Sequence, residues 1–164
     1  MSKVFIVSAA RTAIGKFGGG LQGTSPAELG TIAAKEAIVR SGNSAEDLAI
    51  DEVILGNVLG AGHGMNLARQ VCIGAGLAVS TPAFSVNKVC GSGLKAVTLA
   101  AQAIASGESE CVLAGGSESM SQAAFVSLSS RWGARLGHAE LRDLILQDGL
   151  TDVFGSCHMG ITAE

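Results

Sequence analysis

Short apolar runs alternate with amphipathic stretches along most of the chain. Four runs are short and apolar enough for buried strands, and they lie at residues 4–9, 53–59, 83–86 and 111–114. Apolar residues recur at helical spacing in the segments that follow Pro26, Asn66 and Leu94. Strands that alternate with helices are typical of an α/β fold, so the sequence predicts an α/β class with a largely parallel sheet.

The predicted helices have recognisable ends. Ser25, Pro26 and Glu28 fit a capping box with proline at the first helical position, and this helix is predicted to stop before Gly42. A later helix is predicted to end at Gly107. Its apolar stripe consists of Leu94, Val97, Ala101 and Ile104.

The pattern changes after Met120. Residues 121–137 show no sustained period, and a helix is predicted over 139–147 with Leu141, Leu144 and Ile145 facing inward. This part is expected to form a separate subdomain. Residues 160–164 look like the start of a helix, which favours a polypeptide cut from something longer over a frayed tail.

Composition and charge narrow the class of protein. Glycine makes up 23 of 164 residues, about twice its ordinary ~7% share, which implies tight turns and close packing of small residues. Only 15% of residues are charged and 48% are hydrophobic, so part of the surface is expected to be covered. The net charge of -3 argues against non-specific electrostatic binding of nucleic acid.

No segment fits a signal peptide or a membrane span, and we expect a cytoplasmic protein with no membrane partner.

Cys90 is the strongest candidate for chemistry. The predicted strand 83–86 leads into Cys90, Gly91, Ser92 and Gly93, where the next helix starts. A thiol at that place faces unpaired backbone N–H groups and the positive end of the helix dipole, which favour the thiolate and are also suited to an oxyanion. Position and flanking glycines alone support a nucleophile and a small buried packing residue equally.

The helix end does not by itself ionise the thiol of Cys90. It contributes about 0.3–1 kcal/mol, or ~2 kcal/mol when partly buried, and a pKa unit corresponds to about 1.4 kcal/mol. This free energy is too small to ionise the thiol by itself, so a partner base is needed. The candidates are His63, His138 and His158, none of which the sequence places next to Cys90. No Asp or Glu occurs between Glu52 and Glu108, so the surroundings of Cys90 are not anionic.

The other cysteines show no pattern of a disulfide or metal site. Cys72 and Cys111 lie in apolar segments typical of packing residues, and Cys157 shows no preference. All are widely spaced without a C-x-x-C pair, so free thiols and no metal site are predicted.

A second glycine cluster follows the predicted strand 53–59. Gly60, Gly62 and Gly64 resemble a dinucleotide-binding loop, but Met65 stands where the third glycine is required. The ribose-binding acid expected about 20 residues later is also missing. We interpret this cluster as a structural turn.

Six stretches, taken together, resemble the thiolase family, specifically the acetyl-CoA acetyltransferase type. In family order they are VSAART with GKFGG (7–12 and 15–19), GHGMNLARQ (62–70), NKVCGSGLKAV (87–97), GGSESMS (115–121), DGLTD (148–152) and HMGITAE (158–164). They cover essentially the whole chain. The resemblance implies a thiolase-like amino-terminal half with helices on both faces of a mostly parallel sheet. Residues 1–118 would supply the α/β core half and 119–164 the beginning of the CoA-binding loop domain, with one further sheet strand after that insertion.

The resemblance also implies a function. The family condenses two acetyl-CoA molecules to acetoacetyl-CoA and catalyses the reverse thiolysis, through an acyl-enzyme that would form on Cys90. The backbone N–H of Cys90 would contribute to an oxyanion hole, and His158 and Met159 match positions that line the pantetheine channel. Acyl-CoA and coenzyme A are substrates and products, and no cofactor is implied. Homodimers or homotetramers are expected.

In the family, the activating histidine, the second cysteine and an asparagine of the oxyanion site lie in the carboxy-terminal half, beyond Glu164. We therefore expect the isolated chain to have little thiolase activity and to expose apolar faces that the other half covers. Alternatives are a noncatalytic or split-subunit half that acts through oligomerisation, a broader-chain 3-ketoacyl-CoA thiolase, and a ketoacyl synthase relative. A cysteine hydrolase that uses one of its own histidines is a further alternative.

Overall fold

A three-stranded parallel sheet forms the centre of the molecule. The computed structural model describes residues 3–164. The strands are β1 (Glu52–Gly56), β2 (Ala83–Val86) and β3 (Val112–Gly116), in the order β2-β1-β3. Val53 pairs with both Ala83 and Leu113. The parallel sheet confirms the predicted α/β class and three of the four predicted strands.

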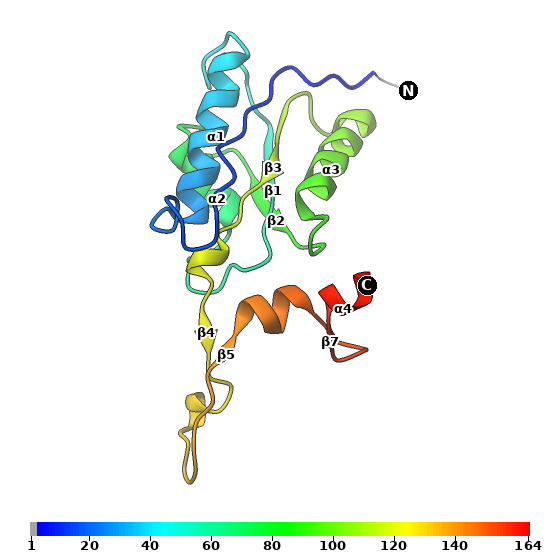
Figure 1. Cartoon of the computed structure of the whole chain (residues 1–164). Helices are drawn as coiled ribbons and strands as arrows, with labels where there is room; N and C mark the ends of the chain where they lie inside the picture. Colours follow the sequence, from blue (N-terminus) through cyan, green and yellow to red (C-terminus); the bar gives the residue numbers. More distant parts are fainter. Residues whose placement is uncertain (1–2) are drawn as a thin grey trace.

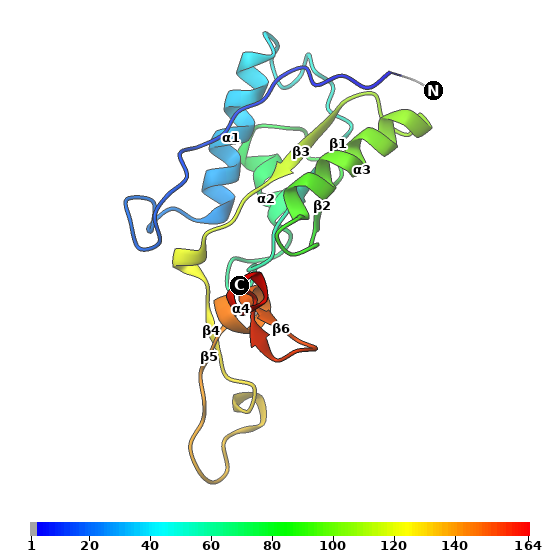
Figure 2. The same ribbon diagram turned by 45° about the vertical axis from the view of Figure 1, so that its right-hand side comes forward.

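Helices cover both faces of this sheet (Figures 1 and 2). On one side lie α1 (Pro26–Arg40) and α2 (Leu67–Gly74), and on the other lies α3 (Ser92–Ser106). Side chains of a strand alternate between faces, so Val53 and Leu55 join the core beneath α1 and α2 while Ile54 joins the core beneath α3. The carboxyl ends of all three strands therefore meet at one edge, where α3 begins.

The ends of the helices follow the predicted local signals. The Ser25 N–H donates to Glu28 Oε2 at 2.8 Å and the Glu28 N–H donates to Ser25 Oγ at 3.2 Å, which confirms the capping box of α1. α2 begins after Asn66, whose Oδ1 accepts from the Arg69 N–H at 3.2 Å. α3 ends at Gly107, which has the left-handed conformation (φ 82°) that favours glycine.

Residues 4–9 are not a strand, and this prediction was wrong. The segment runs extended beside α1 without joining the sheet, and Phe5, Ile6 and Val7 are exposed. One of its side chains is bound to α1, through a hydrogen bond from Ser8 Oγ to the Ala37 carbonyl at 2.7 Å. An apolar run becomes a strand only where a neighbouring strand supplies ladder hydrogen bonds, and no strand among residues 3–164 pairs with it.

The apolar stripe of α3 does not face the sheet. Ala96 and Ala100 are buried against Ile54, whereas Leu94 is 72% exposed and Val97 is exposed as well. The small side chains of Ala96 and Ala100 face the sheet because the helix lies close to it. Leu99 is partly buried against the same cluster, whereas Leu94 and Val97 lie on the outer surface.

The chain after Met120 leaves the layered core (Figure 1). It forms an arm and a small cluster of short elements, which are η1 (Met120–Gln122), β4 (Phe125–Val126), η2 (Ser130–Trp132), β5 (Arg142–Asp143), the π-helix η3 (Ile145–Leu150), β6 (Thr151–Asp152), β7 (Cys157–His158) and α4 (Met159–Ala163). β4 pairs antiparallel with β5, and β6 with β7.

The helix predicted over 139–147 was partly wrong. β5 occupies residues 142–143, and the helix starts only at Ile145, whose N–H donates to Asp143 Oδ1 at 2.8 Å. Leu144 is buried and Ile145 is half-buried as predicted, but Leu141 is exposed because it precedes the helix.

Among residues 3–164, no helix is both long and apolar enough to cross a membrane.

Candidate active site

Cys90 lies in the turn that joins β2 to α3. The strand ends at Val86, the N-cap of α3 is Gly91 and the first helical residue is Ser92. The thiol of Cys90 is free and exposed. The structure therefore confirms the predicted strand-to-helix position, and an exposed thiol beside a helix start is accessible to a ligand.

The backbone immediately before Cys90 is held in an unusual conformation. Val89 has a φ of 48°, in the left-handed region, which costs an L-residue roughly 1–2 kcal/mol. Its N–H donates to Asn87 Oδ1 at 2.9 Å. The Ser92 hydroxyl accepts from the Lys88 N–H at 2.8 Å and donates to the Val89 carbonyl. Strain of this kind persists only where surrounding contacts impose it, and it is common at functional sites.

Three glycines bring the start of α3 against the carboxyl edge of the sheet. A Cβ at Gly56, the last residue of β1, would lie 2.5 Å from the Gly93 nitrogen. A Cβ at Gly116, the last residue of β3, would lie 3.1 Å from the Gly93 Cα. Side chains at these positions would displace the helix start and with it Cys90. The sequence analysis did not assign this role to Gly56, which lies inside the predicted strand 53–59, or to Gly116, which directly follows the predicted strand 111–114.

Hydrogen bonds to the Glu118 carboxylate hold the loop that follows β1 in place. Its carboxylate accepts from the N–H groups of Val58 (2.8 Å) and Leu59 (3.2 Å) and from the Asn57 amide (2.8 Å). The Ser117 N–H donates to the Gly56 carbonyl at 3.1 Å. The GGSESMS segment thus joins the exits of β1 and β3, a role that the sequence reasoning did not assign to Glu118.

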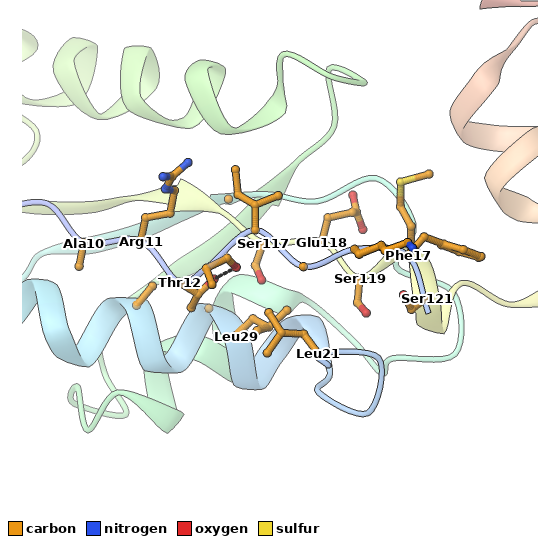
Figure 3. A pocket seen from close by; sticks show the side chains of 18 residues that line it. Ala10, Arg11, Thr12, Phe17, Leu21, Leu29, Ser117, Glu118, Ser119 and Ser121 are labelled. Atoms are coloured by element: carbon orange, nitrogen blue, oxygen red, sulfur yellow. Dashed lines mark hydrogen bonds between the residues drawn. The ribbon is translucent and has the colours of Figure 1, made fainter. Parts of the chain in front are cut away.

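A cavity of about 380 Å³ lies between the segment 10–17, α1 and the exit of β3 (Figure 3). Leu21 and Leu29 line it from the α1 side, and Ser117 and Glu118 line it from the strand exit. Cys90 is not among the lining residues, but Gly116, which touches the start of α3, is. The cavity is therefore separate from the Cys90 turn and is linked to the start of α3 only through Gly116.

No histidine is hydrogen-bonded to Cys90 within residues 3–164. His158 is exposed and its Nδ1 accepts from the Gly160 N–H at 3.0 Å, which caps α4. Met159, the other residue predicted to contact substrate, is also exposed. The Nε2 atom of His63 is buried without a partner among the described residues, and His138 is exposed. The base that Cys90 requires is therefore not supplied by these contacts.

The remaining cysteines differ from Cys90 in their surroundings. Cys72 is completely buried, and burial raises the pKa of its thiol while the nearby Arg69 guanidinium opposes the rise. Burial also raises the pKa of the half-buried Cys111, and the Asp51 carboxylate adds to the rise. Both thiols remain protonated at neutral pH, as expected of packing residues. Cys157 is half-buried.

The second glycine cluster is a turn, as predicted. Gly62 and Gly64 have positive φ, and the His63 N–H donates to the Gly60 carbonyl at 3.2 Å. Arg69 does not point at a ligand site, because its guanidinium donates to the carbonyl of Thr81 at 2.7 Å and to that of Val79. Within residues 3–164, no group of three His, Cys, Asp or Glu side chains is arranged to hold a metal ion.

Comparison with known proteins agrees with this arrangement. The family model described as "Thiolase, N-terminal domain" matches residues 4–164. The chain belongs to this thiolase family, and the resemblance inferred from the motifs is confirmed.

Curated relatives match over the whole chain. An acetyl-CoA acetyltransferase of Cupriavidus necator is 55% identical over 164 residues, and one of Pseudomonas aeruginosa is 52% identical; each match covers 100% of this chain and 41% of the relative. A probable acetyl-CoA acyltransferase of Staphylococcus aureus is 48% identical with the same coverage. The chain thus spans about two fifths of the length of these relatives.

Proposed function

We propose that this chain supplies the nucleophile-bearing part of an acetyl-CoA acetyltransferase. The observation that supports this most directly is the exposed Cys90 thiol one residue before the N-cap of α3. The names of the relatives favour acetyl-CoA as the substrate. A broader-chain acyl-CoA substrate is the second candidate, favoured by the name of the Staphylococcus aureus relative.

In the proposed reaction, the Cys90 thiolate attacks the carbonyl carbon of acetyl-CoA. A tetrahedral oxyanion forms beside Cys90, where the backbone N–H of Cys90 favours negative charge. The oxyanion collapses with loss of the CoA thiolate, which takes up a proton, and leaves an acetyl thioester on Cys90. The α-carbanion of a second acetyl-CoA then attacks this thioester, which releases Cys90 and acetoacetyl-CoA; thiolysis runs the same steps backwards.

The bases for these proton transfers are proposed to lie outside this chain. No histidine is hydrogen-bonded to Cys90 among residues 3–164, and the relatives are more than twice as long as the matched segment. We therefore expect little turnover by the isolated chain. Turnover equal to that of the Cupriavidus necator relative, measured on pure protein, would contradict this expectation.

We further propose that the outer face of α3 packs against another part of a thiolase, either the rest of the family fold or a second copy. Leu94 and Val97 lie exposed on that face. An exposed apolar patch of this kind marks an interaction surface. Residues 119–164 would begin the CoA-binding loop domain, with His158 and Met159 as substrate contacts.

The central experiment is intact-mass analysis after incubation with acetyl-CoA or with iodoacetamide. We expect an acetyl or carbamidomethyl group on Cys90, with Cys72 and Cys111 unmodified because burial raises the pKa of both thiols. Cys90→Ser should abolish the modification. Labelling of Cys157 in preference to Cys90, with Cys90 unreactive, would refute the proposed function.

A further inference from the structure

Ser92 is a buried hydroxyl two residues after the proposed nucleophile. Only 4% of the residue is exposed. Its Oγ accepts from the Lys88 N–H at 2.8 Å and donates to the Val89 carbonyl. Both partners precede Cys90 while Ser92 follows it, so the two hydrogen bonds close a loop around Cys90.

These bonds fix the plane of the peptide between Val89 and Cys90. The Val89 carbonyl accepts both the Ser92 hydroxyl and the Ser92 N–H, the latter at 3.1 Å, so it points toward the start of α3. No peptide bond among the described residues is cis. In a planar trans peptide the carbonyl and the following N–H point in opposite directions. The Cys90 N–H is therefore directed away from the helix start.

The same plane depends on the strained backbone of Val89. Its φ of 48° is unfavourable for a β-branched residue. Without the Ser92 hydroxyl, the Val89 backbone would rotate to a φ/ψ region of lower energy. That rotation would turn the next peptide and move both the N–H and the thiol of Cys90.

We propose that Ser92 is a positioning residue that aims the Cys90 N–H at the oxyanion of the acyl-transfer step. This inference rests on the proposed function of Cys90 as acyl acceptor. Ser92 acts through the Val89–Cys90 peptide and does not itself contact the substrate.

Two reagents separate this role from simple packing. p-Nitrophenyl acetate acetylates the thiol through a tetrahedral oxyanion and releases p-nitrophenolate, whereas iodoacetamide alkylates it by direct displacement of iodide. Only the first reaction needs a correctly aimed N–H donor. Both rates at Cys90 can be followed by intact mass, with Cys90→Ser as the site control.

Ser92→Ala and Ser92→Gly remove the hydroxyl. We expect the rate of acetylation to fall about tenfold or more relative to the rate of alkylation, given that loss of one oxyanion donor costs about 10²–10³ in rate. Ser106→Ala is the matched control, because Ser106 Oγ donates to the Ala103 carbonyl at 2.9 Å at the far end of the same helix. Both of its rates should stay unchanged.

The outcomes distinguish the two proposals. Equal loss, or no loss, of both rates in a folded Ser92 variant overturns the positioning role and leaves the proposed function intact. Failure of acetyl-CoA to acetylate Cys90 at alkaline pH, where a thiol ionises without a partner base, with the p-nitrophenyl acetate ratio still dependent on Ser92, refutes the function alone. If neither variant melts cooperatively, hydrogen exchange is measured on the unsubstituted protein. A protected Lys88 amide supports the hydrogen bond to Ser92 Oγ and with it the positioning role, and a freely exchanging Lys88 amide overturns that role.

Discussion

Gly56 at the end of β1 touches the backbone of Gly93 in the first turn of α3. A Cβ at position 56 would lie 2.5 Å from the Gly93 nitrogen, and it would meet the Ser92 carbonyl carbon as well. Both neighbours are backbone atoms, so they have no flexible side chain to move aside. The position of the Cys90 turn above the sheet therefore depends on the absence of a side chain at residue 56.

Gly56→Ala should destabilise the protein by about 3 kcal/mol, since overpacking against rigid atoms costs roughly 1–3 kcal/mol or more. Alkylation of Cys90 should change as well, because the displaced helix start carries the thiol. Gly23→Ala is the control, since a Cβ there meets nothing within 4 Å. Urea denaturation measures both variants. Equal stability of Gly56→Ala and Gly23→Ala would show that the contact is not tight.

The local features of this fold were predictable from the sequence. The capping box of Ser25 and Glu28 and the turn that holds Cys90 each depend on residues a few positions apart. Short-range hydrogen bonds and glycine conformations decide such features, and the sequence displays them directly.

The features that were predicted wrongly or not at all depend on contacts between residues distant in the chain. Residues 4–9 have a strand-like composition but no paired neighbour among residues 3–164. Gly56 and Gly116 let the start of α3 approach the sheet closely, and Ala96 and Ala100 are the residues of α3 that are buried against Ile54. The contacts of Glu118 reach back about 60 positions (the separations are 59, 60 and 61) to the loop after β1. Periodicity carries no information about such contacts.

Glu118→Ala should lower the free energy of unfolding by about 1–2 kcal/mol. It leaves the N–H groups of Val58 and Leu59 without their carboxylate acceptor, and hydrogen bonds to charged groups contribute about 1.5–3 kcal/mol before the partial solvent exposure of this site is considered. Glu108→Ala removes an exposed carboxylate with no side-chain hydrogen bond among the described residues, and should change stability by less than about 0.5 kcal/mol. Thermal melts of the pair provide the comparison, and equal melting temperatures would exclude the role of Glu118 in holding the loop after β1.

The two faces of α3 should respond oppositely to substitution. Leu94→Lys, on the exposed face, should leave stability within about 0.5 kcal/mol and reduce self-association. Ala96→Leu, on the fully buried face against Ile54, should cost about 2–3 kcal/mol through overpacking. Sedimentation velocity and urea denaturation measure these effects. Strong destabilisation by Leu94→Lys would mean that the stripe is buried after all.

Asp51 joins the beginnings of β1 and β3, and this contact should make stability depend on pH. Its Oδ2 accepts from the N–H groups of Cys111 (3.0 Å) and Glu110 (2.7 Å). These two hydrogen bonds lower the pKa of the Asp51 carboxyl, and the bond from the Cys111 N–H contributes most. A carboxyl whose pKa is lower in the folded than in the unfolded state binds fewer protons when folded. It therefore stabilises the fold above the ordinary Asp pKa of about 3.9, and this stabilisation is lost as the pH falls through the lowered folded value.

Asp51→Asn removes the charge and should be less stable than the unsubstituted protein at pH 6–7, and the difference should shrink as the pH falls below about 4. Asp148→Asn makes the same charge change at an exposed residue of η3 whose side chain has no hydrogen bond among the described residues, so its stability should run parallel to that of the unsubstituted protein. Urea midpoints measured from pH 3 to pH 7 provide the test. Glu28 and Asp47, whose pKa values are lowered by hydrogen bonds from Ser25 and Ser44, add to the acid sensitivity of all three proteins equally. A gap between Asp51→Asn and the unsubstituted protein that stays constant down to pH 3 would mean that the Asp51 charge is not what the Cys111 and Glu110 N–H groups stabilise.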